Sequence, residues 1–176
     1  MRRFLNFFFV ISFLFLNIGI AKSDTLNLAY VDVDIIINDS KIGKKFFGDL
    51  NKSIQKKKKE FSQIENNLKS NEAEILKQKN ILSEEDLKDK INQLRLKISE
   101  YEKQKKIFNE QINNKRLKGT KFMLKSLQTI LANYASENQL SLILQKKNIL
   151  MGISTLDITK PIMEIFNKEV KDINFG

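Results

Sequence analysis

The chain has 176 residues, a formal net charge of +10 at pH 7, and neither cysteine nor histidine. The lack of both residue types excludes disulfide bonds, the common zinc and thiolate sites, and acid–base catalysis by histidine. One proline and six glycines favour long uninterrupted elements over a loop-rich fold.

Residues 1–23 have the pattern of a cleaved signal peptide. Two arginines precede an apolar run, Phe4–Ile20, and the small side chains of Ala21-Lys22-Ser23 suit a signal peptidase that cleaves before Asp24. Cleavage before Lys22 is the second candidate. An uncleaved membrane anchor is the alternative, but the run is shorter than the ~20 residues that a spanning helix needs. The pattern therefore predicts export, and the mature chain keeps a net positive charge.

The mature chain begins with an expected strand and continues into a long helix. Residues 26–33 are apolar and partly β-branched, which predicts a buried strand, and Asp39-Ser40 offers a helix N-cap. From Lys41 to Ile81, apolar residues follow the 3-4 alternation of a coiled-coil seam, which predicts a helix of roughly 60 Å. The stripe consists of Phe47, Leu50, Ile54, Phe61, Ile64, Leu68, Ile75 and Leu82, with the polar residues Lys57, Asn71 and Gln78 between them.

A second long helix is expected after Ser83. Ser83 and Asp86 have the spacing of a capping box, and the acidic run Glu84-Glu85-Asp86 suits the positive end of a helix. Its stripe consists of Leu87, Ile91, Leu94, Ile98, Tyr101, Phe108 and Ile112, with Lys105 as a polar gap. Two helices joined by so few residues must run antiparallel. The register of this hairpin places Ile64 near Tyr101 and Leu68 near Ile98.

The C-terminal third is expected to return to a larger core. Apolar residues become dense between Phe122 and Tyr134, so the second helix should enter this core. Residues 140–144 and 149–153 predict two strands of a hairpin, joined by a turn at 145–148. A short helix should follow, capped by Asp157 or Thr159, with Pro161 in its first turn. Its apolar face consists of Ile162, Ile165, Phe166 and Val170.

These elements predict one α+β domain, mostly helical, over residues 24–176. Strands near both ends form a small body from residues 24–40 and 120–176, and residues 41–119 form a long antiparallel coiled-coil hairpin arm that projects from it. Three strands and one short helix are a small core for a single chain. We therefore expect oligomerisation to complete the body.

No catalytic, cofactor-binding or metal-binding residues can be assigned. The chain has no nucleophile elbow, phosphate-binding loop or EF-hand spacing, so an enzyme is disfavoured. Glu84-Glu85-Asp86 could suggest a metal site, but an acidic first helical turn explains these residues better. Residues 41–60 hold eight lysines, including the run Lys56–Lys59, against Asp49 and Glu60. The run could be a solvated helix face or could capture an anionic partner; nucleic acid is disfavoured by the sparse aromatic residues.

The pattern resembles the Skp (OmpH-like) periplasmic chaperones of Gram-negative bacteria across the whole mature chain. The resemblance rests on the signal peptide, the strand Leu28–Asp32, the helical hairpin and the closing segments. Those segments are Tyr134–Leu144, Ile149–Gly152 and Asp157-Ile158-Thr159 before the last helix.

This resemblance implies a homotrimer with three arms around a cavity. The cavity would hold unfolded outer-membrane β-barrel proteins in the periplasm without ATP and prevent their aggregation. Members are also linked to lipopolysaccharide and anionic lipid surfaces, but no residues of that site, and no client-contact residues, can be transferred. The alternative is a periplasmic coiled-coil adaptor for a folded envelope partner. It predicts a tight seam, and Lys57 and Lys105 count against it.

Overall fold

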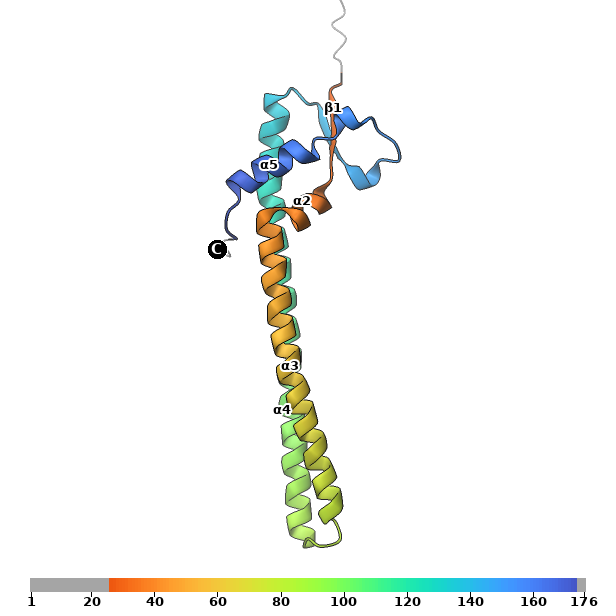
Figure 1. Cartoon of the computed structure of the whole chain (residues 1–176), viewed down its shortest axis with the longest axis vertical. Helices are drawn as coiled ribbons and strands as arrows, with labels where there is room; N and C mark the ends of the chain where they lie inside the picture. The colour runs from red at the N-terminus through yellow and green to blue at the C-terminus, as the bar shows by residue number, and fades with distance from the viewer. Residues whose placement is uncertain (1–25, 174–176) are drawn as a thin grey trace, which may run out of the picture.

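The computed structural model describes residues 26–173, so the expected signal peptide at residues 1–23 lies outside the described residues. The elements in chain order are β1 (Leu28–Val31), α2 (Val33–Asp39), α3 (Lys41–Gln78), α4 (Glu84–Glu137), β2 (Leu142–Gln145), the 3₁₀ turns η1 (Lys146–Asn148) and η2 (Ser154–Leu156), and α5 (Thr159–Glu169). Figure 1 shows α3 and α4 as a long antiparallel arm, with the other elements gathered at one end. The mostly helical α+β fold with a projecting hairpin arm is confirmed.

Both arm helices begin at the predicted caps. The Ser40 hydroxyl accepts the backbone N–H of Gly43 at 3.1 Å at the start of α3. At the start of α4, the Ser83 hydroxyl accepts the N–H of Asp86 at 3.1 Å and donates to its carboxylate at 2.6 Å. The acidic triplet Glu84-Glu85-Asp86 forms the first turn of α4, where it faces the positive end of the helix dipole. The helix α3 ends at Gln78, three residues earlier than expected.

The seam of the arm follows the predicted stripe with one exception. All eleven seam positions from Phe47 to Leu82, including the three polar ones, are buried or partly buried. On α4, Ile98 leaves the seam and is 42% exposed. Ile64 and Tyr101 line the same cleft, in agreement with the predicted register. Lys97 and Tyr101, rather than Ile98, border that cleft beside Leu68, so the second predicted pair is not seen there.

The body is built around the C-terminal part of α4. Met123 and Leu127 are almost completely buried and belong to one core cluster with Ile36 of α2. Ile162 and Phe166 of α5, both fully buried, complete this cluster. The wide apolar stripe therefore enters a larger core, as expected, because α4 is covered here by α2 and α5 in addition to α3.

The first predicted strand is too long. The strand β1 runs from Leu28 to Val31, inside the predicted range of residues 26–33, and the helix α2 that follows at Val33–Asp39 was not predicted. The Asp32 carboxylate accepts the N–H of Ile35 at 3.0 Å and so caps this helix. A helical turn also places Ile36 and Ile37 together in the core, at 0% and 5% exposure. Both groups of contacts favour a helix at residues that, beyond Val33, were assigned to no element from the sequence.

The predicted hairpin of residues 140–144 and 149–153 is wrong. The strand β2 pairs in parallel with β1, with Leu28 opposite Leu142 and Val31 opposite Gln145. The chain then crosses to the other side of β1, where the Ile158 N–H donates to the Tyr30 carbonyl at 2.9 Å. Residues 145–148, the predicted hairpin turn, contain no glycine, and the tight turns of hairpins favour glycine. The segments on either side of them pair with the distant strand β1 instead. Residues 149–153 lie outside any strand.

Candidate functional site

A layer of aromatic and charged residues lies midway along the arm. We call Phe61, Glu65, Tyr101, Lys105 and Phe108 the central layer. The Phe61 ring packs edge-on against Tyr101 and Phe108, with centroids 5.7 Å and 5.9 Å apart. Within residues 61–101, Phe61 and Tyr101 are the two buried residues. The arm from this layer to the tip is therefore held by partly exposed contacts.

The polar members of the central layer form a hydrogen bond and an ion pair with one another. The Tyr101 hydroxyl donates to the Glu65 carboxylate, and the Lys105 ammonium lies 3.6 Å from the same carboxylate. The hydrogen bond from Tyr101 lowers the pKa of Glu65, and the same bond raises the pKa of Tyr101. Lys105 also lies 5.3 Å from the Tyr101 ring centroid. These partners favour one pairing of α3 with α4, although the partial exposure of Glu65 and Lys105 keeps their ion pair weak.

The polar seam residue Lys57 is accommodated in a similar way. Its ammonium forms a 2.8 Å ion pair with Glu60 and lies 5.1 Å from the Phe61 ring centroid. The hydrogen bond from Lys57 lowers the pKa of Glu60. The charge of this seam lysine is thus paired with a carboxylate and an aromatic ring, and its side chain is still about one third exposed.

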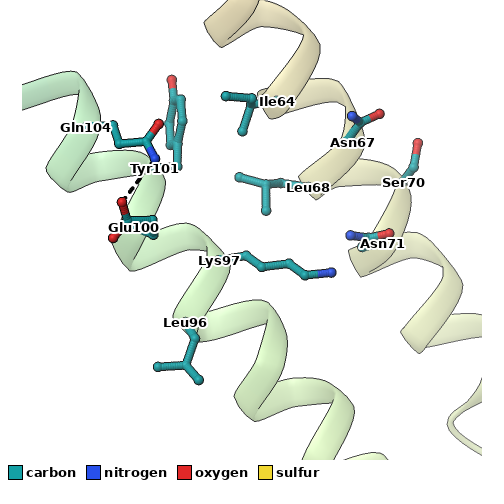
Figure 2. A pocket seen from close by; sticks show the side chains of 10 residues that line it. All are labelled: Ile64, Asn67, Leu68, Ser70, Asn71, Leu96, Lys97, Glu100, Tyr101 and Gln104. Atoms are coloured by element: carbon teal, nitrogen blue, oxygen red, sulfur yellow. Dashed lines mark hydrogen bonds between the residues drawn. The ribbon is translucent and has the colours of Figure 1, made fainter. Parts of the chain in front are cut away.

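A cleft of about 720 Å³ opens between α3 and α4 on the tip side of the central layer. Figure 2 shows Ile64 and Leu68 of α3 facing Tyr101 across it, while the Lys97 side chain reaches toward Asn71. Its remaining lining residues are Asn67, Ser70, Leu96, Glu100 and Gln104. The helices do not fill this space, so apolar surface is left open between polar side chains.

A second cleft, of about 380 Å³, lies on the body side of the central layer. Ile54, Phe61 and Phe108 form its apolar wall, and Lys58 and Lys105 stand among its lining residues. The arm therefore offers apolar surface on both sides of the central layer.

The body exposes apolar side chains along β2 and the segment after it. Leu142 and Leu144 of β2 are 48% and 40% exposed, and Leu150 and Met151 are almost fully exposed. In the described sheet β2 has a single neighbour, β1, so its outer edge is unpaired. Unpaired strand edges and exposed apolar groups are characteristic of surfaces that associate with another chain.

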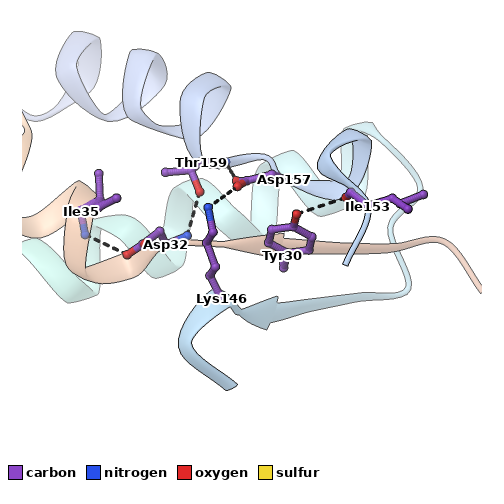
Figure 3. A network of polar contacts seen from close by, with 7 residues as sticks. All are labelled: Tyr30, Asp32, Ile35, Lys146, Ile153, Asp157 and Thr159. Carbon is purple, nitrogen blue, oxygen red and sulfur yellow. Dashed lines mark hydrogen bonds and ion pairs between the residues drawn. The ribbon is translucent and has the colours of Figure 1, made fainter. Parts of the chain in front are cut away.

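A network of polar contacts fixes the segment that carries these apolar residues (Figure 3). Lys146 forms a 2.7 Å ion pair with Asp157, and the Tyr30 hydroxyl donates to the Ile153 carbonyl at 3.1 Å. Asp157 also accepts the N–H of Thr159, the first residue of α5, at 2.9 Å. The N-cap of α5 is Ile158, which forms no side-chain capping bond, so the predicted cap at Asp157 or Thr159 is wrong. Burial raises the pKa of Asp157, but the hydrogen bonds from Lys146 and Thr159 outweigh it and lower the pKa overall. The segment is thus anchored at both ends.

Sequence reasoning assigned no site residues, and it missed the partners within the central layer. It placed Tyr101 in the seam and treated Lys105 as a gap, while Glu65 lay just outside the stripe. An acidic residue one position after a seam residue, opposite a tyrosine in the predicted register, is the signal that could have identified this layer. Within residues 26–173, no group of acidic side chains is arranged to hold a metal ion, and no helix is long and apolar enough to cross a bilayer.

One comparison with known proteins identifies a family, and another identifies a similar fold. The model of the OmpH-like outer membrane protein family matches residues 27–166. Among solved structures, a candidate OmpH-like outer membrane chaperone from Caulobacter crescentus matches with a TM-score of 0.76 at 14% sequence identity. The match covers 85% of this chain and 89% of that chain. The curated proteins gave no match.

Proposed function

The chain belongs to the OmpH-like family, and on that premise we propose that it is a periplasmic holding chaperone. It binds unfolded outer-membrane β-barrel proteins without ATP and without catalysing a reaction, and it prevents their aggregation. The observation that carries this proposal is the pair of open clefts beside the central layer, which expose apolar surface along a projecting arm.

The clefts suit an unfolded chain better than a folded partner. Strands of a membrane β-barrel alternate apolar and polar side chains, so a short stretch offers a few separated apolar groups. Each cleft offers a few apolar side chains between polar ones, such as Ile64 and Leu68 beside Asn67. Several shallow contacts of this kind hold a client through multivalency while each contact remains reversible. An adaptor for a folded partner would instead need a continuous, well-packed seam, and the unfilled clefts count against it.

We also propose that the chain acts as a homotrimer. The outer edge of β2 and the apolar residues Leu150, Met151 and Ile153 need a cover that one chain does not supply. Partner copies that add strands at this edge would bury them and enlarge the small core of the body. The arms of the copies would then surround a shared space for the client.

An aggregation assay tests the proposal. A urea-unfolded outer-membrane β-barrel protein is diluted into buffer with and without purified residues 24–176, and turbidity is followed while light scattering gives the oligomer mass. We expect a trimer that suppresses turbidity. Equal aggregation in both samples would overturn the chaperone function, and a monomeric mass would overturn the trimer.

A matched pair of variants locates the contact. Ile64→Ser with Leu68→Ser removes apolar lining of the larger cleft, whereas Leu76→Ser with Leu117→Ser removes two leucines that are 66% and 67% exposed. We expect the first pair to suppress turbidity less well than the second. Circular dichroism confirms that both variants remain helical, and equal activity of the two pairs would exclude the cleft as a contact.

A further inference from the structure

Positive charge is concentrated in the half of the arm nearest the body. We define the arm base as residues 41–60 of α3 and 103–125 of α4, and the distal arm as residues 61–102. The arm base holds sixteen lysines and arginines against three acidic residues, a net charge of +13. The distal arm holds seven against nine, a net charge of −2. The antiparallel arrangement of α3 and α4 brings the two basic segments side by side (Figure 1).

Most of this charge is not neutralised within the described chain. Five of the sixteen cations have an ion pair within residues 26–173: Lys44, Lys45, Lys52, Lys57 and Lys105. The other eleven have none there, and all eleven are exposed. They are Lys41, Lys56, Lys58, Lys59, Lys103, Lys106, Lys115, Arg116, Lys118, Lys121 and Lys125. Such a surplus of one sign repels itself and adds nothing to folding, but it attracts anions.

The type of cation indicates the type of anion. Fifteen of the sixteen are lysines, and Arg116 is the one arginine. A lysine is a hydrated point charge on a flexible stem and lacks the rigid fork with which arginine binds one carboxylate or phosphate. The arm base is therefore suited to many weak and exchangeable contacts with a ligand whose charges are spread along a mobile chain.

We propose that the arm base is the surface that binds acidic segments of the unfolded client, and that the distal arm does not take part in this attraction. The inference rests on the proposed chaperone function and names the client chemistry that its arm selects. The smaller cleft supports it, because Lys58 and Lys105 stand beside the apolar wall of Ile54 and Phe108. An acidic client segment held there has apolar surface within reach.

The position of the charge favours a polypeptide over a bilayer. The distal arm extends about 27 Å beyond the arm base, at 1.5 Å per residue for residues 61–78 of α3. Residues 77–90 at the tip hold four lysines and four acidic residues, so a flat anionic surface approached by the tip meets no surplus of positive charge there. A flexible chain can instead reach the base between neighbouring arms.

Two variants with equal loss of charge test the proposal. Lys58, Lys59, Lys118 and Lys121 are changed to Gln in the base variant; Lys69, Lys77, Lys79 and Lys88 are changed to Gln in the distal variant. All eight lysines are exposed and have no ion pair within the described residues. Both proteins lose four charges, so a difference between them reports the location of binding and not the net charge.

The probe is a fluorescent twenty-residue polyglutamate, titrated with the full mature chain at low and high salt. We expect the base variant to bind about tenfold more weakly than the wild type, as four exposed charge pairs suggest, and the distal variant to bind within about twofold. High salt should weaken all three because it screens exposed charges. Equal losses in the two variants would overturn the assignment to the arm base.

Two further measurements distinguish this proposal from binding to a lipid surface and from a failure of the proposed chaperone function. Vesicles of phosphatidylglycerol that bind the wild type while polyglutamate does not would overturn the proposal in favour of a lipid surface. The β-barrel aggregation assay is run on the same samples. Aggregation that the wild type fails to suppress would refute the chaperone function, whereas suppression that is equal in the two variants would refute the role of the arm base.

Discussion

The body and the distal arm differ in packing, although one helix runs through both. In the body, α4 buries Met123, Leu127 and Ile130 at 4% exposure or less, because α2 and α5 cover it. In the distal arm, α4 has α3 as its neighbour, and Ile98 remains 42% exposed. A heptad stripe therefore determines which face a helix turns inward, but the number of covering elements determines how much of that face is buried.

The largest effect should come from the same substitution made in the two regions of α4. Leu127→Ala opens a cavity in the fully packed body, and we expect it to lower the free energy of unfolding by about 3 kcal/mol. Leu94→Ala removes a partly exposed contact in the distal arm and should cost about 1 kcal/mol. Urea unfolding followed by circular dichroism at a fixed protein concentration measures both. Equal losses would contradict the comparison.

A smaller effect is expected where the arm joins the body. A Cβ atom at Gly119 would lie 2.2 Å from the Cζ atom of Phe46, whose ring is buried. Gly119→Ala should therefore force the ring or the helices apart and cost about 1–3 kcal/mol.

Gly48→Ala is the matched control, because a Cβ there would meet nothing within 4 Å. It should leave stability unchanged or raise it by up to about 1 kcal/mol, since alanine favours a helix more than glycine does. Thermal unfolding compares the two variants. A stable Gly119→Ala protein would mean that Phe46 can move away at little cost.

The smallest effect should come from the central layer, and it depends on pH. The lowered pKa of Glu65 means that its contribution is present above the ordinary value of 4.5 and is lost as the pH falls through the folded value. The raised pKa of Tyr101 means that its contribution is present below 10.0 and is lost as the pH rises. Tyr101→Phe should therefore be slightly less stable than the wild type near pH 7, and the difference should disappear in acid.

Thermal unfolding of the two proteins at pH 7 and pH 3 measures this difference. Glu65→Gln is the companion variant. It has no carboxylate to titrate, so it should lack the part of the wild-type stability that disappears in acid. A difference between Tyr101→Phe and wild type that persists unchanged at pH 3 would contradict the role of the charged hydrogen bond.

The arm was the predictable part of the molecule because its signals are local. Ser40 and Ser83 cap the helices within three residues, and the heptad stripe repeats along each helix. The central layer was harder to predict, because Glu65 and Tyr101 meet across the hairpin and their contact depends on its register. The long-range partner of Lys105 was hidden for the same reason.

The body was predicted less well because distant segments decide its structure. The helix α2 (Val33–Asp39) was not predicted, although the cap at Asp32 and the burial of Ile36 make these residues helical. The partner of β2 is β1, more than a hundred residues earlier, so a local hairpin was the wrong choice. No pattern within residues 140–153 indicates that pairing.

Because α4 is one unbroken helix, a small change in its direction near the body produces a large displacement at the tip of the arm. From Gly119 to the start of α4 the helix extends about 53 Å at 1.5 Å per residue. A rotation of about 10° where Gly119 meets Phe46 therefore displaces the tip by roughly 9 Å, while the atoms at the fulcrum shift by a small fraction of that. A substitution that tilts α4 at this contact would therefore move the far end of the arm much more than it moves the body.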